Sequence, residues 1–574
     1  MTDDITHPRG LANGLTNYGD NEFSLYLRRS MASSMGYSRE ALSKPVVGIC
    51  SSGSGYNNCH RLMPELVEAT KRGVMMAGGL PIEFPTISLG ETFLNPTSLM
   101  YRNLMSMDVE EMIRAQPMDA VVVIGGCDKT LPAQLMGVAN AGVPVVYCAV
   151  GPMLTSPYNG ERLGACTDCR RFWGKYRAGE IDDKTIKEVE GLLATTAGTC
   201  AVMGTASTMA CLGEALGMML PGTAAIPAVH ADRLRAAEAS GRRALALALA
   251  TGKDQLLPRD IITPDSVENA VRVLLAIGGS TNAIVHLTAI AGRLGIPVPL
   301  DRLNVLSDTT PVLVDLKPTG EHYMEDLFAG GGLVGVLKEL RPLLHLDCMT
   351  VAGETLGERL DRHEGFIDPA IVRPLDSPYQ AKGGLVALFG SLAPRGAILK
   401  RSAADPTLFE TEARAVVFSS LEDLAARIDD PDLDVRADDI LVLQNAGPKS
   451  PAAMPEAGYL PIPKKLARAG VKDMIRISDA RMSGTAFGTI VLHVTPEAAE
   501  GGPLGLARTG DRIKLSVENR SIDLLVDAAE LERRRAEGDA TAVQPTFKRG
   551  YRKLYMDHVM QADGGVDFDF LRGE

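Results

Sequence analysis

Short runs of apolar, often β-branched residues, each followed by turn residues and then by helical periodicity, mark the first part of the chain. Three of these runs lie at 44–50, 119–125 and 143–149. Runs of this length and composition are typical of strands buried on both faces of a parallel sheet. The pattern predicts helices over 61–78, 98–115 and 131–141, then a helix-rich region over about 183–295 that includes 233–249. Residues 1–380 are therefore expected to form an α/β domain with a parallel sheet and many helices.

The pattern changes at about residue 380 to short Val, Ile and Leu runs at close spacing. These runs lie at 384–389, 415–418, 440–443, 489–493 and 513–517. Short strands that follow one another closely are typical of a barrel or a related all-β architecture. We therefore predict a smaller β-barrel-like domain over 381–574. No Pro/Gly/Ser-rich linker marks the boundary, and the sequence has no internal repeat.

Charge narrows the classes of partner. The chain has 574 residues, with 59 Lys and Arg against 71 Asp and Glu, a net charge of −12 without long runs of one sign. Such a chain offers no basic surface for nucleic acid or for an anionic membrane, so a small-molecule partner is expected. The N-terminus lacks a signal-peptide pattern and no stretch approaches eighteen apolar residues, which predicts a soluble, cytoplasmic protein.

Three of the nine cysteines lie in loops rich in small residues. Cys59 ends the segment SSGSGYNNC after the first predicted strand, Cys127 lies in GGCDKT directly after the second, and Cys200 lies in TTAGTCAVMGTAST. The carboxyl ends of sheet strands are where open α/β folds bind ligands, so the three thiols suit a metal or cluster site that folding assembles. The alternative for each is a small, buried cysteine without a role in binding.

A cluster held by only three thiolates would leave one iron position free for substrate, where iron acts as a Lewis acid. The remaining cysteines point to no such site. Cys50, Cys148 and Cys211 lie in apolar runs typical of a core, and no cysteine follows Cys348, which argues against a disulfide framework. Cys166 and Cys169 form a C-x-x-C pair, but no second pair completes a zinc site, so we interpret this spacing as incidental rather than as zinc or redox chemistry.

Residues that could supply oxygen ligands, together with one serine, complete the set of candidate site residues. Asp128 and Lys129 follow Cys127 at the predicted start of a helix, and Glu91 and Glu456 lie in turn-rich segments, where a hard cation such as Mg²⁺ finds carboxylate ligands. Taken alone, Glu91 and Glu456 are each better interpreted as a solvated loop charge. Ser483 lies in RMSGTAFG without a G-x-S-x-G elbow, and the chain has neither a P-loop nor a dinucleotide-binding glycine motif in a strand-turn-helix context.

Taken together, GGCDKT, the Cys59 and Cys200 segments, SLGETF at 88–93, AGPKSPAAMPEAG at 446–458 and ISDARMSGTAFG at 477–488 resemble the dihydroxy-acid dehydratase and phosphogluconate dehydratase family. The resemblance covers nearly the whole chain. It implies a hydro-lyase with an α/β N-terminal domain and a β-barrel C-terminal domain. Residues 88–113 are more similar to the sugar-acid, or aldonate, branch than to the branched-chain amino-acid branch.

The family pattern also implies the roles of the candidate residues. By resemblance, Cys59, Cys127 and Cys200 hold an iron-sulfur cluster. Three thiolates fit both 2Fe-2S and 4Fe-4S, and the resemblance to the sugar-acid branch favours 2Fe-2S. Glu91, Asp128, Lys129 and Glu456 surround Mg²⁺ in the same family pattern. An ammonium has no lone pair to offer a metal, so Lys129 is expected to be carbamylated. Ser483 matches the position of the catalytic base. Relatives are homo-oligomers, which implies a homodimer or homotetramer.

The implied reaction removes water from a 2,3-dihydroxy carboxylic acid, by loss of the C2 proton and the C3 hydroxide, to give a 2-keto-3-deoxy acid. One segment departs from the family pattern: Gln444 replaces an arginine, and Ser450, Ala452 and Ala453 replace Gly, Pro and Gly. This departure puts the loop near Glu456 in question. The alternatives are a branched-chain dihydroxy-acid dehydratase, an electron-transfer iron-sulfur protein and a binding protein that has lost catalysis.

Overall fold

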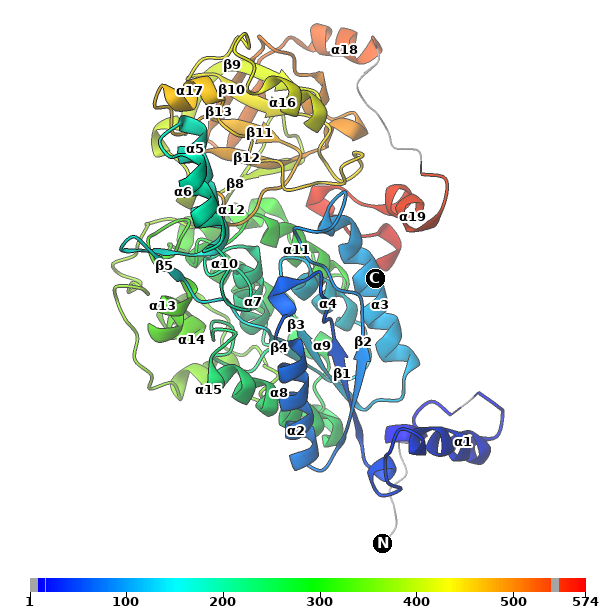
Figure 1. The fold of residues 1–574 in the computed structure, drawn as a ribbon. Helices are drawn as coiled ribbons and strands as arrows, with labels where there is room; N and C mark the ends of the chain where they lie inside the picture. The colour runs from blue at the N-terminus through cyan, green and yellow to red at the C-terminus, as the bar shows by residue number, and fades with distance from the viewer. Residues whose placement is uncertain (1–8, 16, 538–546, 574) are drawn as a thin grey trace.

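The first sheet consists of four parallel strands in the order β2-β1-β3-β4 (Figure 1). The computed structural model describes residues 9–15, 17–537 and 547–573. The strands are β1 (Val46–Ser51), β2 (Leu80–Pro85), β3 (Ala120–Gly125) and β4 (Val145–Ala149). Every residue of β1 and β3 is buried, as their continuous apolar runs predict.

Helices cover both faces of this sheet. The chain steps from β1 to β2 in one direction and from β2 to β3 in the other, so right-handed crossovers place α2 (Met63–Met76) and α3 (Ser98–Ala115) on opposite faces. The helix α8 (Ala231–Leu249) packs along α2, and α4 (Thr130–Val138) packs along α3. The other helices before the second sheet are α1 (Asn21–Ser33), α5 (Ala165–Ala178), α6 (Asp183–Glu190), α7 (Thr205–Ala215), α9 (Pro258–Ile261), α10 (Pro264–Ala276), α11 (Asn282–Gly292), α12 (Leu300–Thr309), α13 (Met324–Ala329), α14 (Gly332–Glu339) and α15 (Leu356–Asp361).

The second sheet has eight strands and is nearly closed into a barrel. Its order is β14-β13-β9-β10-β11-β12-β8-β7, with parallel pairing from β9 to β12 and antiparallel pairing elsewhere. Phe389, just after β7, accepts a backbone hydrogen bond from Ile522 of β14 at 2.8 Å, which brings the two outer strands together. The strands are β7 (Val386–Leu388), β8 (Gly396–Leu399), β9 (Glu410–Phe418), β10 (Ile440–Leu443), β11 (Arg476–Ser478), β12 (Ile490–Thr495), β13 (Arg512–Ser516) and β14 (Ser521–Leu524).

The two predicted regions, one with a parallel α/β architecture and one with a barrel-like β architecture, are confirmed. They contact each other through α5, which extends from the helical region to lie beside α17 (Lys464–Arg468) of the second (Figure 1). An ion pair of 2.6 Å between Arg177 of α5 and Asp429 strengthens this contact. The helices α16 (Leu421–Arg427), α18 (Ala528–Ala536) and α19 (Gly550–His558) complete the second half. Among the described residues, no helix combines the length and the apolar character needed to cross a bilayer.

Candidate metal centre and active site

The candidate site lies at the carboxyl ends of β1 and β3. The strand order reverses between these neighbours, because β1 leads outward to β2 while β3 begins the opposite half of the sheet. Loops that leave such a switch point diverge and open a crevice, the usual ligand site of an open α/β sheet. Cys59 lies in the short turn Asn58–His60 after β1, and Cys127 lies two residues beyond the end of β3. The topology therefore brings these two cysteines together.

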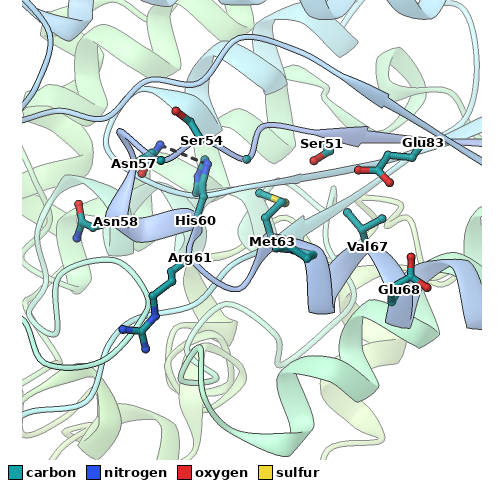
Figure 2. A pocket seen from close by; sticks show the side chains of 13 residues that line it. Ser51, Ser54, Asn57, Asn58, His60, Arg61, Met63, Val67, Glu68 and Glu83 are labelled. Carbon is teal, nitrogen blue, oxygen red and sulfur yellow. Dashed lines mark hydrogen bonds between the residues drawn. The ribbon is translucent and has the colours of Figure 1, made fainter.

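A buried histidine ties the two loops to each other. His60 Nε2 accepts a hydrogen bond of 3.1 Å from the Gly126 N–H, and its Nδ1 lies 2.7 Å from the Ser52 carbonyl oxygen. Burial lowers the pKa of His60, although the contacts with Ser52 and Gly126 oppose this, so the neutral ring donates from Nδ1. Figure 2 shows this ring beside Asn57, whose side-chain oxygen accepts from the Cys59 N–H at 3.2 Å. His60 thus fixes the residues next to both cysteines, a role that its sequence position does not reveal.

The hollow in Figure 2 lies beside this loop and is separate from the thiols. It measures about 570 Å³ and is bordered by the loop after β1 and the start of α2. None of the predicted cysteines or metal-binding acids lines it. We therefore place the candidate active site at the thiols and carboxylates rather than in this hollow.

The three predicted cysteines converge. Contact with the Cys127 thiol, with burial second, raises the pKa of Cys59 well above its ordinary value, and the charge of Cys200 adds to the effect. Cys127 has a left-handed backbone, with φ of 73°, a conformation that non-glycine residues adopt mainly where the surroundings impose it. Sulfur atoms gathered in this way resist ionisation unless a cation compensates their charge, and thiolates are the ligands that iron-sulfur clusters use.

A fourth thiol, which the sequence analysis treated as incidental, joins this group. Cys166 Sγ lies 3.6 Å from Cys200 Sγ, and its helix α5 begins one residue before it. The contact with Cys166, with burial second, raises the pKa of Cys200 well above its ordinary value. The C-x-x-C spacing plays no part in this contact, because Cys166 lies against Cys200 while Cys169 is exposed.

Three carboxylates meet beside the thiols. One oxygen from each of Glu91, Asp128 and Glu456 lies within 4.8 Å of the others, a spacing at which one cation can contact all three. Glu91 follows β2, Asp128 follows Cys127, and Glu456 comes from the loop between β10 and β11. The charge of Asp128 also acts on Cys59 and Cys200, so the acids and the thiols form one continuous site.

Two buried cations accompany the acids. Lys129 Nζ is 3.5 Å from Glu91 and 4.0 Å from Asp128, is fully buried, and has no hydrogen-bond partner among the described residues. Arg481 donates to Glu456 at 2.6 Å and to Glu91 at 2.9 Å, and so joins acids from both halves of the chain. No local sequence pattern predicts this role of Arg481, because its contacts involve residues up to 390 positions away.

The balance of charge differs sharply among the acids. Burial alone would raise the pKa of Glu91, but the charges of Lys129 and Arg481 outweigh it and lower the pKa to about 2. Burial raises the pKa of Asp128 to about 7, with Lys129 opposing the rise and Glu456 and Glu91 adding to it. The site therefore holds more clustered negative charge than its own cations neutralise, which is what a cation-binding pocket requires.

Ser483 lies in a network that supplies hydrogen-bond donors to its oxygen. Its Oγ is 2.8 Å from Thr485 Oγ1, and the Thr485 N–H donates to it at 3.4 Å. Arg170 of α5 donates to Thr485 Oγ1 at 2.7 Å, so the threonine hydroxyl is free to direct its own proton to Ser483. Neither Thr485 nor Arg170 was predicted. Arg481, two residues before Ser483, links this network to the acids.

The segment 444–456, whose sequence departs from the family pattern, still holds Glu456 in place. Gln444 is buried and donates to the carbonyl oxygens of Leu504 at 2.7 Å and Ala507 at 2.9 Å, so it serves the second half of the fold. Ala453 adopts a left-handed backbone with φ of 52°, a conformation that suits glycine better. The loop nevertheless delivers Glu456 to Glu91 and Asp128.

Comparison with known proteins agrees with this geometry. The family model described as dihydroxy-acid/6-phosphogluconate dehydratase N-terminal matches residues 44–359, and the corresponding C-terminal model matches residues 370–566. The chain is 46% identical to L-arabonate dehydratase of Azospirillum brasilense, over 97% of this chain and 96% of that protein. It is 43% identical to 6-deoxy-6-sulfo-D-gluconate dehydratase of Pseudomonas putida, over 95% and 94%.

Identity to relatives named dihydroxy-acid dehydratase is lower. The chain is 38% identical to dihydroxy-acid dehydratase of Pyrococcus abyssi, over 94% of this chain and 97% of that protein. Both halves of the chain match, and the relatives are covered almost from end to end. The protein therefore belongs to the dihydroxy-acid/6-phosphogluconate dehydratase family, and is a dehydratase.

Proposed function

We propose that the protein is a sugar-acid dehydratase, which converts an aldonate to a 2-keto-3-deoxy acid by loss of the C2 proton and the C3 hydroxide. The higher identity to sugar-acid dehydratases than to branched-chain enzymes supports this substrate class. The observation that carries the proposal is that a cluster of cysteine thiols and a cluster of carboxylates lie together at the point where the strand order reverses. Two ligand sets of different chemistry suit a reaction that must both acidify a carbon and expel hydroxide.

The donor atoms fit the cofactors that the family pattern implies. In this proposal Cys59, Cys127 and Cys200 hold a 2Fe-2S cluster, while Glu91, Asp128, Glu456 and a carbamylated Lys129 hold Mg²⁺. The buried Lys129 nitrogen, without a hydrogen-bond partner in the described part of the chain, supports carbamylation, because the added carboxylate replaces a buried charge by a ligand. When bound, the two centres supply Lewis acidity toward the substrate carboxylate with its C2 oxygen and toward the C3 hydroxyl.

Ser483 is proposed as the base that takes the C2 proton. A serine hydroxyl is too weak a base unless its anion is stabilised. The backbone N–H of Thr485 donates to Ser483 Oγ. Because Arg170 already donates to the threonine hydroxyl oxygen, the proton of that hydroxyl is free to point toward Ser483 Oγ as well. Donors that favour the charged form lower the pKa of the group that accepts them.

One experiment tests both the reaction and its substrate. Anaerobically reconstituted protein is assayed for 2-keto acid formation from pentonates, hexonates, glycerate and 2,3-dihydroxyisovalerate. We expect turnover of a pentonate or hexonate. Preference for 2,3-dihydroxyisovalerate would show that the protein is a branched-chain dihydroxy-acid dehydratase. No turnover of any of these acids would refute the proposed dehydration.

The serine has its own test. We expect Ser483→Ala to lower kcat by at least about 100-fold, the usual effect of losing a general base, with unchanged iron content. Ser516→Ala is the matched control, because Ser516 is also buried but lies in β13. Normal turnover of Ser483→Ala with a full complement of iron and Mg²⁺ would remove Ser483 from the mechanism.

An electron-transfer protein is the second candidate, because Cys166 adds a fourth thiol to the group. Electron-transfer clusters normally have four protein ligands. That function, however, gives no reason for Glu91, Asp128 and Glu456 to gather. A stable reduction of the reconstituted protein without any dehydration would favour it. The division at residue 380, a homodimeric or homotetrameric assembly and a cytoplasmic location stay predictions.

A further inference from the structure

Cys166 and Cys200 form a thiol pair. The proposed function uses Cys200 as a cluster ligand and gives Cys166 no role. The two sulfur atoms are 3.6 Å apart although the residues are 34 positions apart in the chain. Both residues are only half-buried, which leaves part of each exposed to solvent. A disulfide requires a sulfur–sulfur distance of about 2.0 Å, which a modest rotation of the two side chains can close.

Both backbones are held in place. Thr167, next to Cys166, donates to the Thr485 carbonyl oxygen at 2.9 Å, and the Gly164 N–H donates to Asp168 at 2.8 Å at the start of α5. On the other side, the Thr199 N–H donates to the Gly151 carbonyl oxygen at 3.0 Å, which fixes the residue before Cys200. The proximity of the two thiols is therefore built into the fold rather than created by a mobile loop.

We propose that Cys166 and Cys200 form an intramolecular disulfide when the cluster-free chain meets a peroxide, and that this bond withdraws Cys200 from iron. One thiol attacks a peroxide oxygen, the O–O bond breaks, and a sulfenic acid and water result. The second thiol attacks the sulfenic sulfur, the S–O bond breaks, and a second water leaves as the S–S bond forms. The two sulfurs are oxidised and the peroxide is reduced to two waters, so no other oxidant is needed.

The disulfide prevents iron binding, but it also protects the two thiols from irreversible oxidation. A lone sulfenic acid is oxidised further to sulfinic acid, which ordinary thiols do not reverse, whereas a disulfide is reduced by a dithiol. Each thiol of the pair thereby protects the other from further oxidation. This inference rests on the proposed function only in treating Cys200 as an iron ligand, and the disulfide itself does not depend on dehydration.

The test treats cluster-free protein with hydrogen peroxide and maps its peptides without reduction by mass spectrometry. We expect a peptide pair that joins Cys166 to Cys200 and lacks two hydrogen atoms. The oxidised protein then takes up less than about a tenth of the iron and sulfide of the reduced protein during reconstitution, and a dithiol restores uptake. Iron content and the visible absorption of the cluster are the readouts.

Two variants make the result specific. In Cys166→Ser and Cys166→Ala, we expect no linked peptide, two added oxygen atoms on Cys200, and a loss of iron uptake that a dithiol does not repair. Cys169→Ser, three residues along the same helix and exposed, is expected to behave as the wild type.

Three outcomes would overturn the proposal: no linked peptide after peroxide has consumed the thiols, a link from Cys200 to Cys59 or Cys127 instead, or reversible loss of iron uptake in both Cys166 variants. Failure of the proposed function looks different. In that case the linked peptide forms in the wild type and blocks iron uptake, but the fully reduced and reconstituted protein binds iron without dehydrating any sugar acid.

Discussion

Lys400 offers a stability test that reports on the surroundings of Ser483. Its side chain is 1% exposed, and its Nζ donates to the carbonyl oxygen of Gly484, the residue after Ser483, at 3.3 Å. Burial lowers the pKa of Lys400 from the ordinary 10.5 to about 7. Each pH unit corresponds to about 1.4 kcal/mol, so keeping the ammonium charged in the folded protein costs up to about 5 kcal/mol.

The direction of the pH dependence follows from proton counts. Below pH 7 the lysine is protonated in both the folded and the unfolded chain, so the whole cost is present. Between pH 7 and pH 10.5 only the unfolded chain binds the proton, so the free energy of unfolding of the wild type rises with pH relative to a chain without the lysine. Lys400→Met is therefore expected to be more stable than the wild type at about pH 6, by the full cost less about 1 kcal/mol for the lost hydrogen bond.

Urea unfolding of both proteins between about pH 6 and pH 9.5 measures this difference, which we expect to shrink by about 1.4 kcal/mol per pH unit above pH 7. Lys382→Met is the control, because Lys382 is largely exposed. A stability difference for Lys400→Met that does not change with pH would refute the reasoning. Turnover is a second readout: we expect it to fall in Lys400→Met, since the Gly484 carbonyl loses the donor that holds it beside Ser483.

Three further predictions concern the site. Thr485→Val removes a donor to Ser483 Oγ, and we expect kcat to fall by about 10- to 100-fold with iron content unchanged; normal kcat would show that the threonine hydroxyl does not assist the base. Arg481→Lys cannot reach both Glu91 and Glu456, so urea unfolding is expected to show a loss of about 3 kcal/mol, and equal stability would contradict the buried pairing. Protein incubated with ¹³C-bicarbonate is expected to give a carbamate signal by NMR that is absent in Lys129→Met, and a signal retained in the variant would exclude Lys129 as its source.

Hydrophobic patterning was sufficient for the elements with simple sequences. The strands expected at 119–125 and 143–149 correspond to β3 and β4, and the helix expected over 98–115 is α3. The strand β2 was missed because its sequence, LPIEFP, contains two prolines and little of the apolar run that marks its neighbours. Proline lacks a backbone donor and is tolerated there because β2 lies at the edge of the sheet.

The same distinction between local and long-range information applies to the residues of the site. Motifs adjacent in sequence, such as Cys127 with Asp128 and Lys129, carried the resemblance and its implied ligands. Residues that act through long-range contacts were missed, because no local pattern records them: Arg481 contacts Glu91 across 390 positions, and Cys166 contacts Cys200 only after α5 has packed. Only topology explains why the loops after β1 and β3 face each other.

The order of the ligands along the chain has a consequence for how the protein matures. All the thiols of the site precede residue 201, whereas Glu456, Arg481 and Ser483 arrive with the last quarter of the polypeptide. During synthesis the N-terminal portion emerges and folds first. A half-made chain can gather its sulfur ligands but has no complete acidic pocket, so loading with the hard cation must wait until translation is nearly finished.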